Sequence, residues 1–425
     1  MKVKSFLILS LILSFVFNMA AQDVKEPIEQ KFEFTNSWKK ALQAAKSENK
    51  VIFIQFITDD CPPCNKLKNE IWTDVKLADI YAKYFILLKP KIGSKEAKDL
   101  EKKYKIHSYP TSIFVDPNSK IVHKYLGFVS SEIMIQMAEN VHNNKNTLAY
   151  FERMMKSKEA SNNPDLLFEY ANALMHAGED YKKIAEKYFK TQNEEDLRTA
   201  QNLKAIMQFS DDMYSREFGF LARNIDVYEG EGIDRNQIIM KVEDVISNSL
   251  MKTLAASPKV SLDDTLNSIF NYFDLTIRDL VQSRVEMDYY DIIKHDKSRY
   301  FQSMEVYMNT HLAYMNSMEI ADRAEQVLLE SDDKIMINNA VLWINEAMIR
   351  QESPSEELCT ISIKLLASDG RYQEANDILD MLSNLWSKTG ISDKEALRRR
   401  EELTEYIDSK MGQMSDEGNE LEINR

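Results

Sequence analysis

The sequence predicts an α/β domain with a mixed central sheet, followed by an all-α region. Two observations lead to this fold class. Up to about residue 145, apolar strand-like segments alternate with helical patterns, and two strands joined as a hairpin come late in the order. Beyond residue 147, only Pro164, Pro258 and Pro354 interrupt about 280 residues in which no alternating strand pattern appears. We therefore assign residues 22–145 to the α/β domain and residues 146–410 to the helical domain.

The first 21 residues are typical of a secretory signal peptide. Lys2 and Lys4 precede an apolar stretch from Phe6 to Phe17, and Asn18-Met-Ala-Ala21 offers small residues for cleavage. The apolar stretch is short for a membrane span, although an uncleaved N-terminal anchor is the alternative. No later segment is apolar for long enough to be transmembrane, and no cysteine stands at the cleavage point to carry a lipid. We expect a soluble, exported mature chain, with the periplasm as its compartment.

The α/β domain should begin with a helix that starts at Asn36-Ser-Trp38 and runs to about Glu48. The next segment, Val51–Ile57, is apolar apart from Gln55, which predicts a buried central strand covered on both faces. The remaining elements are expected, in order, as a helix from the cysteine pair toward Trp72, a strand at Tyr84–Lys89, a helix at Ser94–Lys105, strands at Thr111–Val115 and Ile121–Tyr125 joined by a turn, and a helix from Ser130 or Ser131 to Val141.

The helical domain contains two stretches that resemble each other. One begins at Leu166 and turns at Gly178, and the other begins at Leu358 and turns at Gly370. Each places an aromatic residue and an alanine at helical spacing after the glycine, as tetratricopeptide-type hairpins do. Residues 190–340 show no clean period, so an irregular helical domain without repeats remains the alternative. Residues 411–425 are expected to form a disordered tail.

Charge is unevenly divided between the two halves. Residues 1–145 hold 22 lysines and 16 acidic residues, which leaves 32 basic and 52 acidic residues for the rest of the chain. Such an acidic region argues against nucleic acid and anionic membranes as partners. The simplest role for this charge is solubility.

The chemistry in this sequence is concentrated in Cys61-Pro-Pro-Cys64, at the predicted junction of a strand and a helix. A cysteine at a helix N-terminus faces free backbone N–H groups, which favour the thiolate. The second cysteine, one turn further on, is placed to attack a mixed disulfide. A zinc site would need two more ligands, and no second cysteine pair exists. Covalent haem would need histidine at position 65, which is asparagine. A structural disulfide stays open, although so short a loop adds little stability.

Residues 34–143 resemble the thioredoxin superfamily. The resemblance rests on Trp38, the strand Val51–Ile57, the Cys61-Pro-Pro-Cys64 motif, the run Tyr104–Thr111 before the hairpin, and Gly127. It implies a thioredoxin fold and thiol–disulfide oxidoreductase activity on protein cysteines, with Cys61 as nucleophile and Cys64 as resolving cysteine. It also implies a cis bond before Pro110 and a substrate-binding role for Tyr109, Pro110 and Thr111, with the Tyr109 backbone pairing with an extended peptide.

Two positions depart from the family pattern. Asp60 replaces a tryptophan before the first cysteine, and Gln55 replaces a buried carboxylate of the family's reductases. Asp59 and Asp60 should raise the pKa of Cys61. These tuning residues put the efficiency and the redox direction in question. Intact cysteines favour an enzyme, whereas Gln55 and Asp60 favour a binding protein whose thioredoxin-like domain is a scaffold.

The expected partners follow from this assignment. They are cysteine-containing protein or peptide substrates, an electron donor, and a protein or peptide bound by the helical domain. Neither a cofactor beyond the Cys61–Cys64 disulfide nor a metal is expected. Cys359 lies among apolar residues and is expected to be a buried hydrophobe, with a reactive partner thiol as the alternative. His107, near Pro110, is expected to be a solvated loop residue.

Overall fold

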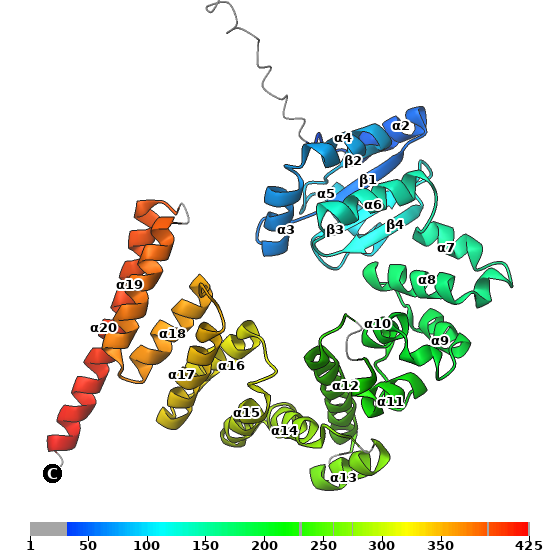
Figure 1. The fold of residues 1–425 in the computed structure, drawn as a ribbon. Helices are drawn as coiled ribbons and strands as arrows, with labels where there is room; N and C mark the ends of the chain where they lie inside the picture. The colour runs from blue at the N-terminus through cyan, green and yellow to red at the C-terminus, as the bar shows by residue number, and fades with distance from the viewer. Residues whose placement is uncertain (1–31, 229–231, 258, 274, 389–390, 424–425) are drawn as a thin grey trace, which may run out of the picture. The chain divides into compact units, whose positions relative to one another are not determined.

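The computed structural model describes residues 32–228, 232–257, 259–273, 275–388 and 391–423. The signal-peptide prediction for residues 1–21 lies outside these ranges. The chain separates into two compact units, Met1–Gln192 and Asn193–Arg425. Helices and strands alternate in the first unit, and the described part of the second unit is helical (Figure 1). The predicted succession of an α/β domain and a helical region is confirmed.

The first unit contains the predicted helices and strands with ends that differ by a few residues. Its elements are α2 (Trp38–Glu48), β1 (Val51–Phe56), α3 (Pro62–Lys66), the π-helical turn η1 (Leu67–Ile71), α4 (Val75–Tyr84), β2 (Phe85–Leu88), α5 (Lys95–Tyr104), β3 (Thr111–Val115), β4 (Ile121–Leu126), α6 (Ser131–His142), α7 (Leu148–Met154), the 3₁₀ turn η2 (Ala160–Asn162), α8 (Pro164–His176) and α9 (Lys182–Thr191). Helix α4 was not predicted. The sequence did contain a start signal for this helix, because aspartate is a preferred N-cap residue. In the structure the Asp74 side chain caps α4 by accepting a hydrogen bond from the Leu77 N–H (3.1 Å).

The sheet is mixed and has the strand order β2-β1-β3-β4. Strand β1 pairs in parallel with β2 and antiparallel with β3, which in turn pairs antiparallel with β4. Strand β1 is therefore central, as its apolar sequence predicted. The β3–β4 turn is closed by Asp116, whose carboxylate accepts hydrogen bonds from the N–H groups of Asn118 and Lys120.

Each face of the sheet is covered by a pair of helices. Alternation along β1 sends Phe53 to one face and Ile52 and Ile54 to the other. The Phe53 face packs against α4 and α6 and shares its apolar cluster with Cys61 and Cys64. The other face packs against α2 and α5. Both clusters are buried, so the loop that leaves β1 toward the cysteines starts from a fixed position.

Helices α7, α8 and α9 belong to the same compact unit as the sheet, with α7 and α8 packed along β4 and α9 packed on α8. Lys124 of β4 is buried, and its ammonium lies 3.3 Å from the Glu179 carboxylate after α8. The Tyr125 ring stacks on His176, with ring centroids 4.8 Å apart. Gly178 has φ +67°, and a Cβ there would lie 2.8 Å from Leu126 Cδ2. The domain end at residue 145 stays a prediction, and the packing unit continues through α9.

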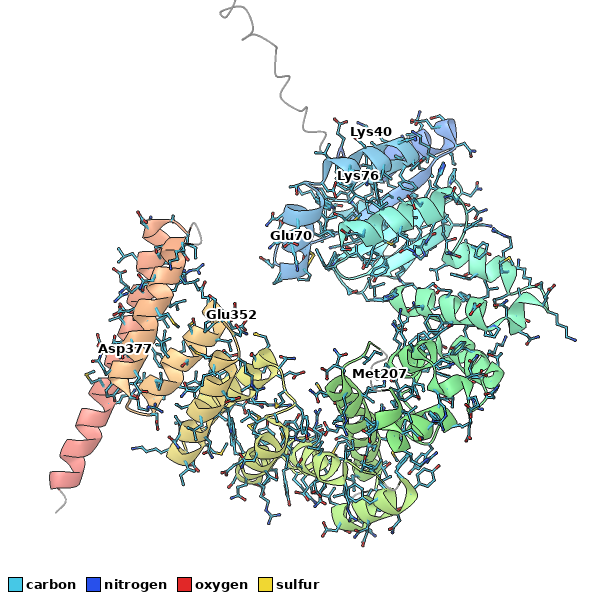
Figure 2. All side chains as sticks on the ribbon, in the orientation of Figure 1. Lys40, Glu70, Lys76, Met207, Glu352 and Asp377 are labelled. Atoms are coloured by element: carbon cyan, nitrogen blue, oxygen red, sulfur yellow. A yellow bond between two sulfur atoms is a disulfide. The ribbon has the colours of Figure 1, made fainter. Side chains whose placement is uncertain are left out.

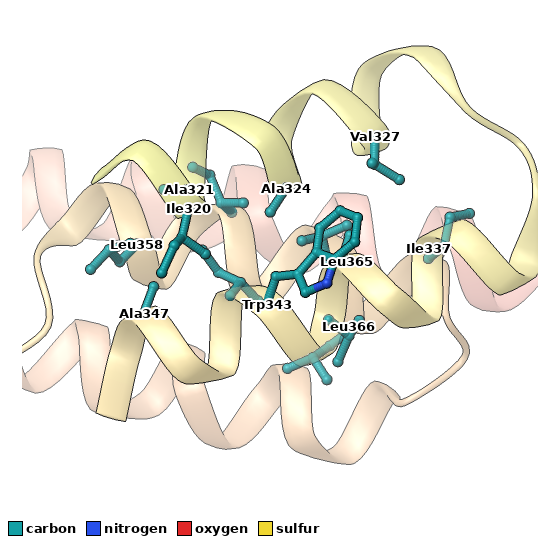
Figure 3. Close-up of a cluster of buried hydrophobic side chains, with 14 of the residues drawn as sticks. Ile320, Ala321, Ala324, Val327, Ile337, Trp343, Ala347, Leu358, Leu365 and Leu366 are labelled. Carbon is teal, nitrogen blue, oxygen red and sulfur yellow. The ribbon is translucent and has the colours of Figure 1, made fainter. Parts of the chain in front are cut away.

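The described part of the second unit is built from consecutive helices: the 3₁₀ turn η3 (Asp196–Arg198), α10 (Ala200–Phe209), α11 (Arg216–Arg223), the 3₁₀ turn η4 (Ile225–Tyr228), α12 (Arg235–Ala256), α13 (Leu262–Phe273), α14 (Arg278–Asp288), the π-helical turn η5 (Tyr289–Ile293), α15 (Lys297–His311), α16 (Ser317–Glu330), α17 (Lys334–Ile349), α18 (Glu356–Ser368), α19 (Tyr372–Lys388) and α20 (Asp393–Ile423). Trp343 of α17 packs between α16 and α18, beside Ala324 and Leu365 (Figure 3). Charged side chains such as Glu352 and Asp377 are exposed (Figure 2).

The two sequence stretches that resemble each other form helical hairpins with the same turn. Gly178 and Gly370 both adopt positive φ, at 67° and 80°. In each hairpin the next residue, Glu179 or Arg371, donates its N–H to a carbonyl five residues back. A regular repeat stays a prediction. Helix α20 continues to Ile423, into the segment for which the sequence predicted a disordered tail. Within the described ranges, every helix is too short or too polar to cross a lipid bilayer.

Candidate redox site

Strand β1 and helix α3 place Cys61 at a helix start. Cys61 is the N-cap of α3, with extended backbone angles, and its Sγ accepts a hydrogen bond from the Cys64 N–H at 3.2 Å. Pro62 and Pro63 fill the first helical positions, where a missing N–H leaves nothing unsatisfied. An N–H aimed at Sγ stabilises negative charge on that sulfur, so the reduced Cys61 is positioned to be a thiolate.

Cys61 and Cys64 form a disulfide with an S–S distance of 2.06 Å and a Cα–Cα distance of 5.2 Å. The two residues differ in accessibility, since Cys61 retains 9% of its surface and Cys64 none. Both cysteines belong to the same apolar cluster, and Cys61 is the one that keeps some exposed surface.

The loop before β3 lies against Cys61. The Tyr109–Pro110 peptide bond is cis, which is the isomer that the resemblance implied. The Tyr109 carbonyl oxygen lies 3.7 Å from Cys61 Sγ. The Pro110 carbonyl accepts a hydrogen bond from the Gly127 N–H (2.8 Å), and Thr111 is buried with its hydroxyl donated to the Ser108 carbonyl (2.7 Å). Three residues were predicted to bind substrate. The Tyr109 carbonyl lies near the Cys61 sulfur, whereas Pro110 and Thr111 form hydrogen bonds to Gly127 and Ser108 that hold the loop.

Gln55 is fully buried on the face of β1 that also carries Phe53. Its Nε2 donates to the Thr111 carbonyl at 3.2 Å, and its Oε1 accepts from the Ser112 hydroxyl at 3.0 Å. Both ends of the amide are therefore occupied by β3. An amide held in this way links two strands and cannot accept a proton from Cys64 at neutral pH.

The two aspartates before Cys61 are exposed. The Asp59 carboxylate lies 3.0 Å from the Lys68 ammonium, and the Asp59 side chain is fully accessible to solvent. The effect of Asp59 and Asp60 on the Cys61 pKa stays a prediction. His107 is also exposed.

Two contacts at the site were not predicted from the sequence. The Tyr109 hydroxyl donates to Glu101 Oε1 of α5 at 2.7 Å. The Lys66 ammonium lies 4.8 Å from the centroid of the Phe128 ring, in the loop after β4. Glu101 is one of several charged residues on α5, so only the fold singles it out. Phe128 directly follows Gly127, which the resemblance had named.

Cys359 lies in the second unit, where it is 1% exposed. Burial raises the pKa of its thiol, which favours the expected role of a small buried hydrophobe. Among the described residues, no group of three or more histidine, cysteine, aspartate and glutamate side chains is arranged to hold a metal ion.

Residues 38–142 match the family model described as a thioredoxin-like domain. This segment is a thioredoxin-like domain. The Plant UBX domain-containing protein 11 of Arabidopsis thaliana is 26% identical over 131 residues, which are 30% of this chain and 24% of that protein. This chain therefore spans about a quarter of the length of that curated relative.

Solved structures similar to the thioredoxin-like domain include a candidate disulphide-isomerase from Bacteroides thetaiotaomicron, with 28% identity, 26% of this chain and 93% of that chain covered, and a TM-score of 0.25. A thioredoxin from Thermus thermophilus is 17% identical, with 26% and 87% covered and a TM-score of 0.25. A DsbH oxidoreductase is 19% identical, with 29% and 93% covered and a TM-score of 0.26. The similarity is confined to less than a third of this chain, and the family match is what assigns the domain.

Proposed function

We propose that this chain is an exported thiol–disulfide oxidoreductase that acts on protein cysteines through Cys61 and Cys64. The observation that carries the proposal is the Cys61 sulfur, which accepts a hydrogen bond from the Cys64 N–H at the start of α3 and belongs to a disulfide within a thioredoxin-like domain. Export rests on the signal-like residues 1–21. The chemistry needs no cofactor beyond the cysteine pair.

In the reducing direction, the Cys61 thiolate attacks a substrate disulfide, forms a mixed disulfide and releases one substrate thiolate. The Cys64 thiolate then attacks Cys61 Sγ, which restores the Cys61–Cys64 bond and releases the second substrate thiolate. Two electrons pass to the substrate, and a separate dithiol donor must return them to the enzyme. Oxidation of a substrate dithiol is the same sequence in reverse.

The rival function is a binding protein with an acidic helical domain and a redox domain of little turnover. The buried Gln55 amide favours this rival, because it stands where the family's reductases have a buried carboxylate. In either case we propose that the helical domain binds a protein or peptide partner, since helical arrays offer extended surfaces.

A redox titration separates these functions. The purified chain should be equilibrated in glutathione or dithiothreitol buffers and trapped with a thiol-reactive mass tag. We expect a potential of roughly −120 to −270 mV for the Cys61–Cys64 couple, the range of exchange enzymes. A value below about −300 mV, with slow exchange, would identify a structural staple.

Gln55→Glu should accelerate the resolving step. A carboxylate at this position can accept the Cys64 proton, and burial beside the Thr111 carbonyl should hold its pKa well above the ordinary value. The rate at which Cys64 resolves a mixed disulfide should therefore rise with pH as this carboxyl ionises. Because the pKa is raised in the folded state, folding stability should fall over the same pH range. Stopped-flow kinetics and urea unfolding from pH 5 to 9 measure both effects.

Gln55→Leu is the matched control, since it removes the amide and offers no base. A Gln55→Glu variant that folds normally and resolves at the parental rate at every pH would mean that another group takes the Cys64 proton.

A further inference from the structure

We infer that Glu101 is a positioning residue for thiol–disulfide exchange, because its carboxylate holds the residue whose carbonyl faces the nucleophilic sulfur. The inference rests on the proposed function of the cysteine pair. Glu101 lies on α5, outside the cysteine motif and outside the Pro110 loop. It reaches the site through the Tyr109 phenol, which donates to Glu101 Oε1 at 2.7 Å. The Tyr109 carbonyl oxygen lies 3.7 Å from Cys61 Sγ.

Helix α5, which carries Glu101, is held in place by its packing and by its N-cap. Leu100 and Tyr104, on either side of Glu101, are each 3% exposed and pack against the sheet. The Ser94 side chain caps the helix by accepting the Ala97 N–H at 3.1 Å. With the helix backbone held in place, the Glu101 side chain can still change rotamer, and its hydrogen bond with the Tyr109 phenol restricts that change.

The far side of the Pro110 loop is already tied to the sheet. The Pro110 carbonyl accepts the Gly127 N–H, and the Thr111 carbonyl accepts Nε2 of Gln55. On the near side, Ser108 is exposed, and its carbonyl accepts the Thr111 hydroxyl at 2.7 Å. Tyr109 packs against the apolar clusters on both faces of the sheet, and the hydrogen bond from its phenol to Glu101 adds a polar contact at the end of its side chain. Loss of the phenol contact should let the Tyr109 side chain shift within this packing and change the position of the carbonyl that lies 3.7 Å from Cys61 Sγ.

The position of this carbonyl changes the acidity of Cys61. In the reduced protein, an S–H group can donate to the Tyr109 oxygen, which stabilises the thiol and raises its pKa. The Cys64 N–H has the opposite effect, because it stabilises the thiolate. Burial and the Glu101 hydrogen bond raise the pKa of the Tyr109 phenol to about 12, so it remains a donor across the working pH range. The hydrogen bond between the Tyr109 phenol and Glu101 therefore influences the pKa of Cys61, by setting how close the Tyr109 carbonyl lies to its sulfur.

The test measures Cys61 directly in the reduced full-length protein. Iodoacetamide alkylation of Cys61 is followed by mass spectrometry of its peptide from pH 4 to 10, and the midpoint gives the apparent pKa. Glu101→Ala and Tyr109→Phe should each lower this pKa by about 0.5 to 1 unit. Glu101→Gln, whose amide oxygen can still accept from the phenol, should stay within about 0.2 units of the parent. Asp99→Ala, which removes an exposed acid from the same helix, should leave the pKa unchanged.

Two results would overturn the inference. If Cys61 kept its parental pKa in both Glu101→Ala and Tyr109→Phe, the position of the Tyr109 carbonyl would not depend on the hydrogen bond between the phenol and Glu101. An equal shift in Glu101→Gln and Glu101→Ala would assign the effect to the charge of Glu101. If Glu101→Ala loses its circular dichroism signal, the comparison of Tyr109→Phe with Glu101→Gln decides. The alkylation needs no substrate, so a parent protein that fails to exchange disulfides counts against the proposed function and leaves this test intact.

Discussion

Cys64→Ala should accumulate mixed disulfides with substrate proteins, and Cys61→Ala should accumulate none. Cys61, at the helix start, keeps 9% of its surface exposed, whereas Cys64, one turn later, is fully buried. Without Cys64, the mixed disulfide on Cys61 has no internal thiol to release it. Both variants should lose insulin-disulfide turnover by about 10³-fold or more, because each step needs its own sulfur. Non-reducing electrophoresis after acid quenching measures the trapped species.

Cys359→Ser is the control for this experiment. Its thiol is buried in the second unit, so the variant should turn over like the parent and trap nothing. The order of attack would be contradicted if both Cys61→Ala and Cys64→Ala trapped equal amounts of adduct that a reducing agent releases. It would also be contradicted if neither variant trapped any.

A fragment ending at residue 145 should be less stable than one ending at residue 192. The shorter fragment lacks α7 and α8, which cover β4, and α9, which packs on α8. It uncovers the face of Tyr125 that stacks on His176, and it takes Glu179 away from Lys124. Lost apolar burial alone should lower the free energy of unfolding by about 2 to 4 kcal/mol. Urea unfolding of residues 22–145 and 22–192, both oxidised, measures the difference.

The pH dependence of stability gives a second readout for the same fragments. Burial, and then the neighbouring His176, lower the pKa of His123 to about 4. The unfolded chain takes up this proton near pH 6.5, so the stability contribution is lost as pH falls from about 6.5 to 4. The loss should be at most about 3 kcal/mol in the longer fragment and smaller in the shorter one, where His176 is absent. Equal urea midpoints and equal pH profiles would place the functional domain end at residue 145.

Much of the α/β domain could be predicted because its signals are local. Val51–Ile57 is apolar on both alternating faces, which only a central strand requires. Helix α4 was missed although Asp74 marks its start, because the helix joins β2 directly at Phe85 and leaves no turn between them. The cysteine motif was equally local, because its spacing after a strand places two thiols one helical turn apart, while their roles as nucleophile and resolving cysteine came from the family resemblance.

The sequence by itself thus determined the fold class, the central strand and the identity of the cysteine pair. Only the tertiary structure decided which groups touch that pair. Gln55 is satisfied by Thr111 and Ser112 on a strand 56 and 57 positions away, and Glu101 was one acid among several until the fold placed it on the Tyr109 phenol. The packing of α7 and α8 onto β4 likewise brings Lys124 to Glu179, a residue 55 positions further along the chain. Local propensities act over a few residues, whereas these contacts depend on distant segments meeting in the folded chain.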